Sequence, residues 1–252
     1  MKWKGTRRAL PADSSPLHSP LAKRHSPLAE PLSRVLEPEA MDTADEARDY
    51  DAMDHAAVNA RFVADFLDAH GPCRGGEILD VGTGPARIPI ALCRADGKAR
   101  VIGVDLAMTM LATAGRNIEE AGLAGRIRLE RGDAKRLGAS DASFEAVVSN
   151  TIIHHIPDPA LAMAEMARLV APGGTIMVRD LARPDDQAEV DRLVSSYAGR
   201  EPKAARDLFE ASLHAALTPG EVRKIIEGLG LPGSGVSMTS DRHWTWVWHR
   251  PS

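Results

Sequence analysis

Cysteine is scarce in this sequence, long apolar runs are missing, and neither sign of charge dominates. The two cysteines, Cys73 and Cys93, have neither a disulfide-framework nor a metal-type spacing, so we expect a reducing, cytoplasmic environment. No apolar run approaches the roughly 20 residues that span a bilayer, which predicts a soluble protein without a membrane partner. The net charge of -4 gives no general attraction to nucleic acid.

The first 40 residues differ in composition from the rest of the chain. The segment PADSSPLHSPLAKRHSPLAEPLSR (11–34) repeats Ser-Pro-Leu and has prolines too often for a helix. Its isolated leucines show neither a helical nor a strand period. We therefore expect residues 1–40 to form a disordered leader without chemistry, with a transit-like tag or a phosphorylatable tail as alternatives. Residues 41–252 are expected to form one domain.

From residue 41 onward, short apolar segments alternate with amphipathic ones. The segment 55–71 has a helical apolar stripe that stops at Gly71. Five strands are expected in EILDV (77–81), RVIGVDL (100–106), RIRLERGDA (126–134), FEAVVSNTII (144–153) and TIMVRDL (175–181). Amphipathic helices separate them, the last one beginning at Asp158-Pro159 and ending at the Pro-Gly-Gly of 172–174. This alternation predicts an α/β fold with a doubly wound, mostly parallel sheet.

The C-terminal third departs from that alternation. Two extra helices are expected at 184–198 and 206–217, and a third begins at the capping box Thr218-Pro219-Gly220-Glu221. Two late strands, 234–240 and 243–250, complete a seven-stranded sheet. Trp244, Trp246 and Trp248 share one face of the last strand, and we expect them to pack in the core rather than to bind a substrate.

Polar residues stand where consecutive strands end. Asp80, Gly82 and Gly84 follow the first strand, and Asp105, Asp133 and Asn150 end the next three. In an open parallel sheet, ligands bind beyond these carboxyl ends. The dinucleotide pattern G-x-G-x-x-G fails because Arg87 occupies its third glycine position, and Asp80 would repel a pyrophosphate. A nucleoside that carries a cationic amino acid fits better, because Asp105 can accept from ribose hydroxyls and Asp133 from an adenine amine.

With these segments in order, the chain resembles the class I S-adenosylmethionine-dependent methyltransferases, especially the small-molecule group of types 11 and 25. The resemblance runs from about Gly71 to Leu181 and rests on LDVGTGPA, VIGVDLAMTML, RGDA, FEAVVSNTIIHHIPDP and LVAPGGTIMVRDL. Ala86 replaces a usual third glycine, a departure of one methyl group. The resemblance implies a seven-stranded Rossmann-like fold and S-adenosylmethionine as cofactor. The implied cofactor-binding residues are Asp80, Gly82, Gly84, Asp105, Leu106, Asp133, Ala134 and Asn150.

The same resemblance implies an acceptor side. The segment 41–70 is expected to cover the cofactor as a lid, with Tyr50 and His55 reaching the cleft. His154 and His155 follow the fourth strand, where a general base could lie, and Tyr50 is a further catalytic candidate. The helices of 184–217 would roof the acceptor pocket, with Arg183, Arg206 and His214 as acceptor contacts. Each of these residues has a purely structural alternative, and for the two histidines packing is the favoured one.

We therefore expect an enzyme that transfers a methyl group to a small molecule by in-line displacement. Alternatives are a nucleic-acid or protein methyltransferase, which the absence of an Asp/Asn-Pro-Pro-aromatic segment disfavours, a non-catalytic cofactor-binding subunit and, more distantly, an NAD-dependent dehydrogenase. No metal is expected, because His154 and His155 would point to opposite faces of an extended chain. The acceptor, the acceptor atom and the oligomeric state are left open by the sequence.

Overall fold

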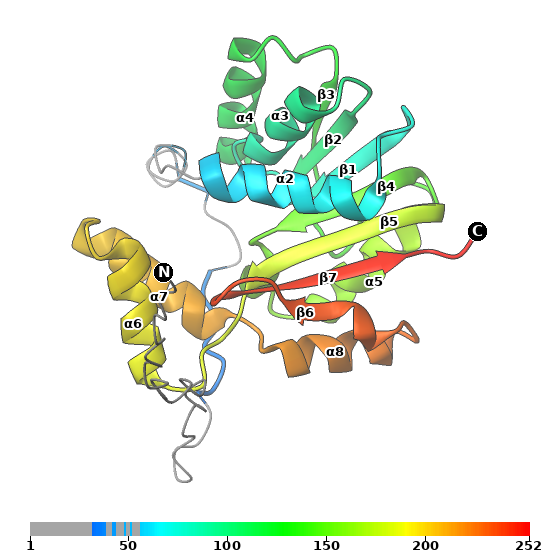
Figure 1. Ribbon diagram of the computed structural model, residues 1–252. Coiled ribbons are helices and arrows are strands. Elements are labelled where there is room, and N and C mark those ends of the chain that lie inside the picture. The colour runs from blue at the N-terminus through cyan, green and yellow to red at the C-terminus, as the bar shows by residue number, and fades with distance from the viewer. Residues whose placement is uncertain (1–31, 39–41, 44–47, 49–50, 52–55) are drawn as a thin grey trace, which may run out of the picture. The chain divides into compact units, whose positions relative to one another are not determined.

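The computed structural model describes residues 32–38, 42–43, 48, 51 and 56–252. Within this part of the chain, seven strands form one sheet in the order β3-β2-β1-β4-β5-β7-β6 (Figure 1). The strands are β1 (Glu77–Val81), β2 (Arg100–Asp105), β3 (Ile127–Arg131), β4 (Phe144–Asn150), β5 (Val170–Leu181), β6 (Val236–Met238) and β7 (His243–His249). The first five run parallel, and β7 is antiparallel to both of its neighbours. The predicted doubly wound, mostly parallel sheet is confirmed.

Helices cover both faces of the sheet, because side chains alternate in direction along each strand. On one face, Ile78 and Val101 pack with α2 (Ala56–His70), α3 (Arg87–Ala95) and α4 (Met108–Glu120). On the other, Leu79 and Ile102 pack with α5 (Pro159–Leu169) and α8 (Pro219–Gly228). In Figure 1, α2 crosses in front of the sheet, and α5 lies behind β5 and β7.

The tryptophans of β7 belong to the core, as the sequence predicts. Trp244 and Trp246 are fully buried on the face covered by α5 and α8, and Trp248 packs against the same cluster. The capping box is confirmed as well, since the Thr218 hydroxyl accepts from the Glu221 N–H while Glu221 accepts from the Thr218 N–H. A short 3-10 turn, η2 (Gly233–Gly235), leads from α8 into β6.

The two extra helices after β5 are α6 (Gln187–Ala198) and α7 (Lys203–Ala215), which lie beyond the carboxyl end of β5 (Figure 1). Leu181 at the end of β5 packs with Val190 and Leu193 of α6 and Leu213 of α7 in a third apolar cluster. No helix in the described part of the chain is long and apolar enough to cross a bilayer.

Several element boundaries differ from those predicted, and two of the differences have a clear structural cause. Helix α5 ends at Leu169, before the Pro-Gly-Gly of 172–174, and these residues form an irregularity inside β5, where Phe144 pairs with Val170 but Ala146 pairs with Thr175. Strand β4 ends at Asn150 rather than at Ile153, because Thr151 has a φ of 58° that no strand can continue.

The boundary of the leader also differs. Residues 32–38, predicted to be part of a disordered leader, pack against the folded domain, with Leu32 in the cluster of α6 and α7. The Val35 N–H donates to the His214 carbonyl at 3.1 Å, and the Arg34 guanidinium donates to the carbonyls of His154 and Ala215. These backbone carbonyls, at the end of α7 and in the turn after β4, hold the segment in place. The amino-acid composition, on which the prediction of a disordered leader rested, does not reveal such contacts. Residues 1–31 lie outside the described residues.

Candidate functional site

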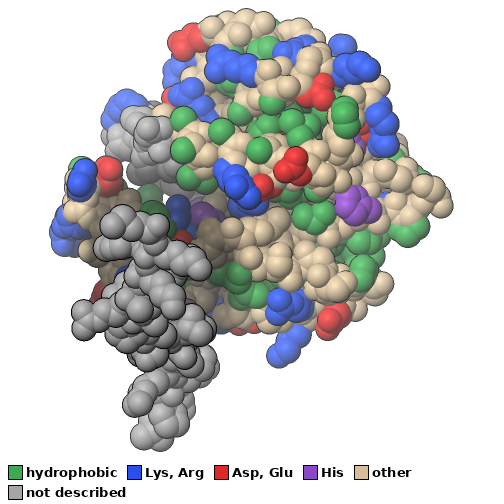
Figure 2. All heavy atoms as spheres, in the orientation of Figure 1, with side chains coloured by type: hydrophobic (Ala, Val, Ile, Leu, Met, Phe, Trp, Pro, Cys, Tyr) green, Lys and Arg blue, Asp and Glu red, His purple; other side chains and the backbone are tan. Residues whose placement is uncertain are grey.

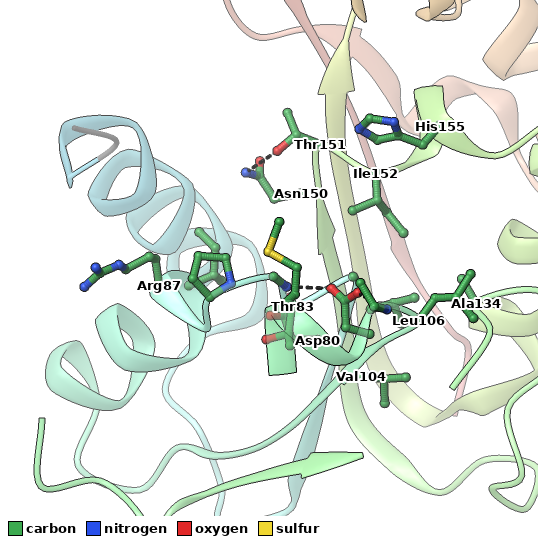
Figure 3. Close-up of a pocket in the computed structure, with 18 of the residues that line it drawn as sticks. Asp80, Thr83, Arg87, Val104, Leu106, Ala134, Asn150, Thr151, Ile152 and His155 are labelled. Atoms are coloured by element: carbon green, nitrogen blue, oxygen red, sulfur yellow. Dashed lines mark hydrogen bonds between the residues drawn. The ribbon is translucent and has the colours of Figure 1, made fainter. Parts of the chain in front are cut away.

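One pocket lies at the carboxyl ends of β1, β2 and β4 (Figure 3). All eight residues expected to bind the cofactor line it: Asp80, Gly82, Gly84, Asp105, Leu106, Asp133, Ala134 and Asn150. They come from four separate stretches of sequence, which the parallel strand order places side by side. The chain thus gathers its strand-end polar groups around a single cavity.

The glycine turn after β1 forms the floor of this pocket. Gly82 and Gly84 have φ angles of 75° and 51°, in the left-handed region that glycine adopts without strain. The N–H groups of Gly82 and Thr83 donate to the Val104 carbonyl at 2.8 and 2.9 Å, which ties the turn to β2. A Cβ atom on Gly82 would lie 2.3 Å from the Ile152 side chain, whereas one on Gly84 would meet nothing within 4 Å. The turn therefore has no space for a side chain at Gly82, where it packs against Ile152, but it has free space at Gly84.

Ala86 occupies the position of the missing third glycine and has a φ of 61°. This is the left-handed conformation that a Cβ atom disfavours by roughly 1–2 kcal/mol. Its side chain is fully buried in the core beneath the turn, and α3 begins at the next residue, Arg87. The substitution therefore adds backbone strain, and its methyl group lies in the core rather than in the lining of the pocket.

Asp105 links the end of β2 to the glycine turn. Its two carboxylate oxygens accept from the Gly84 N–H at 2.8 Å and from the Ala107 N–H at 2.9 Å. Burial raises the pKa of Asp105, while these backbone donors oppose the rise. Each carboxylate oxygen has a further lone pair, so Asp105 keeps the capacity to accept from a ligand hydroxyl. Asp133, at the end of the next strand, accepts from the Lys135 N–H at 2.9 Å.

Three buried oxygens at the pocket have no partner in the described part of the chain. They are Oδ2 of Asp80, Oγ1 of Thr83 and Oδ1 of Asn150. Burial raises the pKa of Asp80 to about 7, and the charge of Asp105 adds to this effect, while the neighbouring Thr83 hydroxyl opposes it. Buried polar groups without a partner are costly and rare, and all three of these residues line the pocket. The site therefore favours a ligand that brings hydrogen-bond donors or positive charge.

The chain turns sharply after β4. Thr151 is a β-branched residue with a φ of 58°, a conformation found mainly where surrounding structure enforces it. Its N–H donates to the Arg179 carbonyl at 2.8 Å, and its hydroxyl accepts from the Asn150 amide at 3.0 Å. The next residues form a 3-10 turn, η1 (Ile153–His155). Figure 3 shows Ile152 and His155 on the same side of the pocket beyond this turn.

The part of the chain that forms most of the pocket matches a known protein family. Residues 78–174 match the family model described as a methyltransferase domain. The chain is 34% identical over 110 residues to a phosphatidylethanolamine N-methyltransferase of Cereibacter sphaeroides, and 34% identical over 119 residues to a ubiquinone biosynthesis O-methyltransferase of Methylococcus capsulatus. These alignments cover 44% and 47% of this chain and 53% and 48% of the two relatives. The chain thus matches about half the length of these curated relatives.

The fold agrees with this match. A Methanococcus maripaludis protein described as an S-adenosyl-L-methionine-dependent methyltransferase superposes with a TM-score of 0.65 at 16% identity, over 86% of this chain and 98% of that one. The chain is therefore similar to S-adenosylmethionine-dependent methyltransferases, in sequence over residues 78–174 and in fold over most of its length. The cofactor of this family is S-adenosylmethionine.

Two described residues of the expected lid, Asp51 and Asn59, line the pocket. Asp51 pairs with Arg87 at 2.8 Å and accepts from the Asn117 amide at 3.0 Å, while Asp42 accepts from the Thr109 hydroxyl. These contacts join the segment before α2 to the first turn of α3 and to both ends of α4. The catalytic and acceptor roles expected for Tyr50 and His55 fall outside the described residues.

The two histidines after β4 have different surroundings. His155 lines the pocket, whereas His154 is 4% exposed and does not. Nδ1 of His154 lies 2.6 Å from Oδ1 of Asp180, and the His154 N–H donates to the other oxygen of this carboxylate. Burial lowers the pKa of His154, but the carboxylates of Asp180 and Glu37 together outweigh it and raise that pKa above its usual value. Burial, followed by the charge of His154, lowers the pKa of His155 to about 4.

The expectation that the two imidazoles point to opposite faces is wrong. The 3-10 turn brings their ring centroids to 4.1 Å, because this tight helix does not alternate side chains as a strand does. Both rings face Glu37, whose Oε1 lies 3.3 Å from Nε2 of His154 and 3.2 Å from Nδ1 of His155. The reason given above for expecting no metal at these histidines, that their rings point apart, therefore does not hold.

The three acceptor contacts expected after β5 do not line the pocket among the described residues. Arg183 is buried and pairs with Glu221 at 2.5 Å, so its guanidinium fixes the start of α8. Arg206 donates to the Glu201 carbonyl in the turn before α7. His214 lies near the end of α7, where its carbonyl accepts from Val35. Their roles as acceptor contacts therefore stay predictions.

Sequence reasoning missed several residues that shape this region. Asp180 stands at the end of the fifth strand, so the rule that located Asp105 and Asp133 could also have indicated it. Thr151 and Ile152 gave no signal beyond a buried run. Glu37 lies in the proline-rich segment, where no periodicity points to a buried acid.

The raised pKa of Asp80 predicts a specific pH dependence of stability. Between the pKa of an unfolded aspartate, about 3.9, and the folded value of about 7, the folded state holds a proton that the unfolded chain has released. The contribution of Asp80 to stability therefore falls as pH rises through this window. Thermal melts of the cofactor-free protein from pH 5 to 8 should show this loss, and Asp80→Asn should remove it. Equal slopes for both proteins would contradict the assignment.

Proposed function

We propose that the protein transfers a methyl group from S-adenosylmethionine to a small-molecule acceptor. The observation that carries this proposal is the set of acceptor groups around one pocket, with the unpartnered Asp80 and Asn150 oxygens among them. A pyrophosphate would place negative charge against Asp80, whereas a sulfonium with an amino group brings cations and donors. The residues present thus fit S-adenosylmethionine better than they fit a nicotinamide dinucleotide.

The proposed binding roles follow from the position of each group. Asp105 would accept from the ribose hydroxyls at the end of β2, with Leu106 beside it. Asp133 would accept from the adenine amine, and the Ala134 N–H would donate to a ring nitrogen. Asp80 and the turn from Gly82 to Gly84 would hold the amino acid portion, with Asn150 on the opposite wall.

When bound, S-adenosylmethionine supplies an electrophilic methyl group on a sulfonium sulfur. The chain has to align an acceptor with that group and keep water away, which is most of what an in-line displacement requires. Asp51 and Asn59 close the pocket from the side of α2. Of the two histidines, His155 is the one on the pocket wall, so we propose it on the acceptor side.

The acceptor is proposed only as a small molecule. The two relatives named above are an N-methyltransferase and an O-methyltransferase, and both align with this chain over less than half of its length. The matched methyltransferase domain of residues 78–174 contains the proposed cofactor residues. We therefore propose that segments outside it, such as 32–38 and the helices α6 and α7, determine the acceptor. A cytoplasmic location remains part of the proposal.

The surface does not favour the nucleic-acid alternative. On the face drawn in Figure 2, Lys and Arg side chains are interspersed with acidic, apolar and other groups, and the described residues form no continuous basic stripe there. A protein that tracks a phosphate backbone needs such a stripe.

A screen of acceptors with S-adenosylhomocysteine release as the readout tests the proposal. The panel should include ethanolamine-type amines and hydroquinones, the acceptor types suggested by the relatives' names. At least one class should give acceptor-dependent release. Cofactor binding without release for any acceptor would instead favour a non-catalytic cofactor-binding subunit.

A further inference from the structure

Three metal-ligating side chains meet beside the pocket. One ligand atom from each of Glu37, His154 and His155 lies within 4.8 Å of the others. The side chains are nearly buried, with exposed fractions of 8%, 4% and 13%. The cluster thus differs from a group of surface acids, which solvent would separate.

Segment 32–38 carries Glu37 into this position and is held there from both sides. The Arg34 guanidinium donates to the carbonyls of His154 and Ile156, both at 3.0 Å, and to Ala215 at 2.7 Å. The Ser212 hydroxyl of α7 donates to Oε1 of Glu37 at 3.1 Å. The carboxylate is therefore oriented by groups that are not themselves ligands.

The histidine side of the cluster is oriented in the same way. Asp180 is fully buried and binds Nδ1 of His154 at 2.6 Å, which leaves Nε2 facing Glu37. A carboxylate that binds the far nitrogen of a histidine is the usual support of a metal-ligating imidazole, because it fixes the tautomer and the ring. The β4–η1 turn at Thr151 brings His155 alongside.

The spacing of the donor atoms suits a single ion. Two donors that each lie about 2.1 Å from zinc are about 3.0–3.4 Å apart for bond angles between roughly 90° and 109°. Oε1 of Glu37 lies 3.3 Å from Nε2 of His154 and 3.2 Å from Nδ1 of His155. Both distances fall in this range.

We propose that Glu37, His154 and His155 bind a divalent transition-metal ion such as Zn²⁺. Two imidazoles and one carboxylate form a donor set that binds zinc or ferrous iron and leaves coordination positions open. The carboxylates of Glu37 and Asp180 balance the charge of the ion. The nearby Arg34 cation is directed at backbone carbonyls instead.

The open coordination positions of the proposed ion could bind the methyl acceptor. His155 also lines the cofactor pocket, so the ion lies at the boundary between the pocket and segment 32–38. A hydroxyl acceptor bound to the ion would release its proton to water more readily, because a divalent cation stabilises the oxyanion that would then take the methyl group. This role points to an oxygen acceptor and rests on the proposed function, whereas binding of the ion does not.

Metal binding can be measured on the full chain without cofactor or acceptor. The chelator-treated protein should bind one equivalent of Zn²⁺ in calorimetry, and Co²⁺ in its place should give the visible absorption of a low-symmetry nitrogen and oxygen site. Glu37→Gln and His155→Ala should each weaken binding at least 100-fold. Asp180→Asn, which removes only the support of His154, should weaken it about 10- to 100-fold.

His214→Ala is the matched control, because this histidine lies on α7 next to segment 32–38 but outside the cluster. It should bind Zn²⁺ like the unaltered chain. Glu37→Gln keeps the shape of the side chain, and its melting curve would show whether the fold is intact. Less than one equivalent in the unaltered protein, or equal affinity in Glu37→Gln, would overturn the proposal. S-adenosylmethionine binding by the metal-free protein is measured separately, so failure of the metal site and failure of the cofactor site are distinguishable.

Discussion

Replacing Asp105 with asparagine is expected to weaken S-adenosylmethionine binding by about 100-fold or more. The carboxylate accepts from the Gly84 and Ala107 N–H groups, and the proposed ribose hydroxyls would use its remaining lone pairs. Asparagine removes the charge and one acceptor, and its amide would face a backbone donor. Hydrogen bonds to a charged group contribute about 1.5–3 kcal/mol each, so the loss of two accounts for the expected change.

Calorimetry or equilibrium dialysis measures this effect directly. Asp133→Asn should be milder, at about tenfold, because that side chain is 41% exposed and already pairs with Lys135. Asp68→Asn, an exposed aspartate on α2, should bind like the unaltered chain. If Asp105→Asn keeps its fold and binds with unchanged affinity, Asp105 does not hold the ribose.

Gly82→Ala is expected to destabilise the protein by about 2–4 kcal/mol. The residue has a φ of 75°, where a Cβ atom costs roughly 1–2 kcal/mol. The new atom would also lie 2.3 Å from Ile152, and such overpacking typically costs about 1–3 kcal/mol. For a domain of this size, the melting temperature should fall by about 5–15 °C.

Gly84→Ala provides the matched control for this substitution. Its φ of 51° imposes a similar backbone strain, but its Cβ would meet nothing within 4 Å. Thermal melts should therefore show a smaller loss for Gly84→Ala, and the double variant Gly82→Ala/Ile152→Ala should recover the part due to the clash. Equal melting temperatures for the two single alanine variants would contradict the close contact with Ile152.

The sheet and the cofactor side of the pocket could be read from the sequence. Buried strands give continuous apolar runs, and the carboxyl ends of parallel strands meet at one edge, so Asp80, Asp105 and Asp133 could be grouped without coordinates. The sequence shows that Ala86 replaces a usual glycine. It does not show that Ala86 has a left-handed backbone conformation, because alanine is not a residue typical of that conformation. The binding roles of these residues remain proposals for the experiments above.

The acceptor side could not be read in the same way. The rings of His154 and His155 come together because the chain leaves β4 with a positive φ at Thr151. The sequence SNTIIHH gives no indication of that turn. Glu37 reaches them through contacts with α7 and the β4–η1 turn, made between residues more than 100 positions apart in the chain. Contacts between residues so far apart in the chain produce no periodic pattern in the local sequence. The salt bridge of Arg183 to Glu221 could not be predicted for a related reason, because topology positions a backbone but not the partner of its side chain.

Calorimetric titration of the unaltered chain with S-adenosylmethionine tests the central claim most directly. We predict saturable binding of one cofactor per chain, with no competition from NAD, because Asp80 and Asn150 present unpartnered acceptors to a cationic ligand. No saturable binding, or displacement of S-adenosylmethionine by NAD at comparable concentration, would contradict the assignment of this pocket.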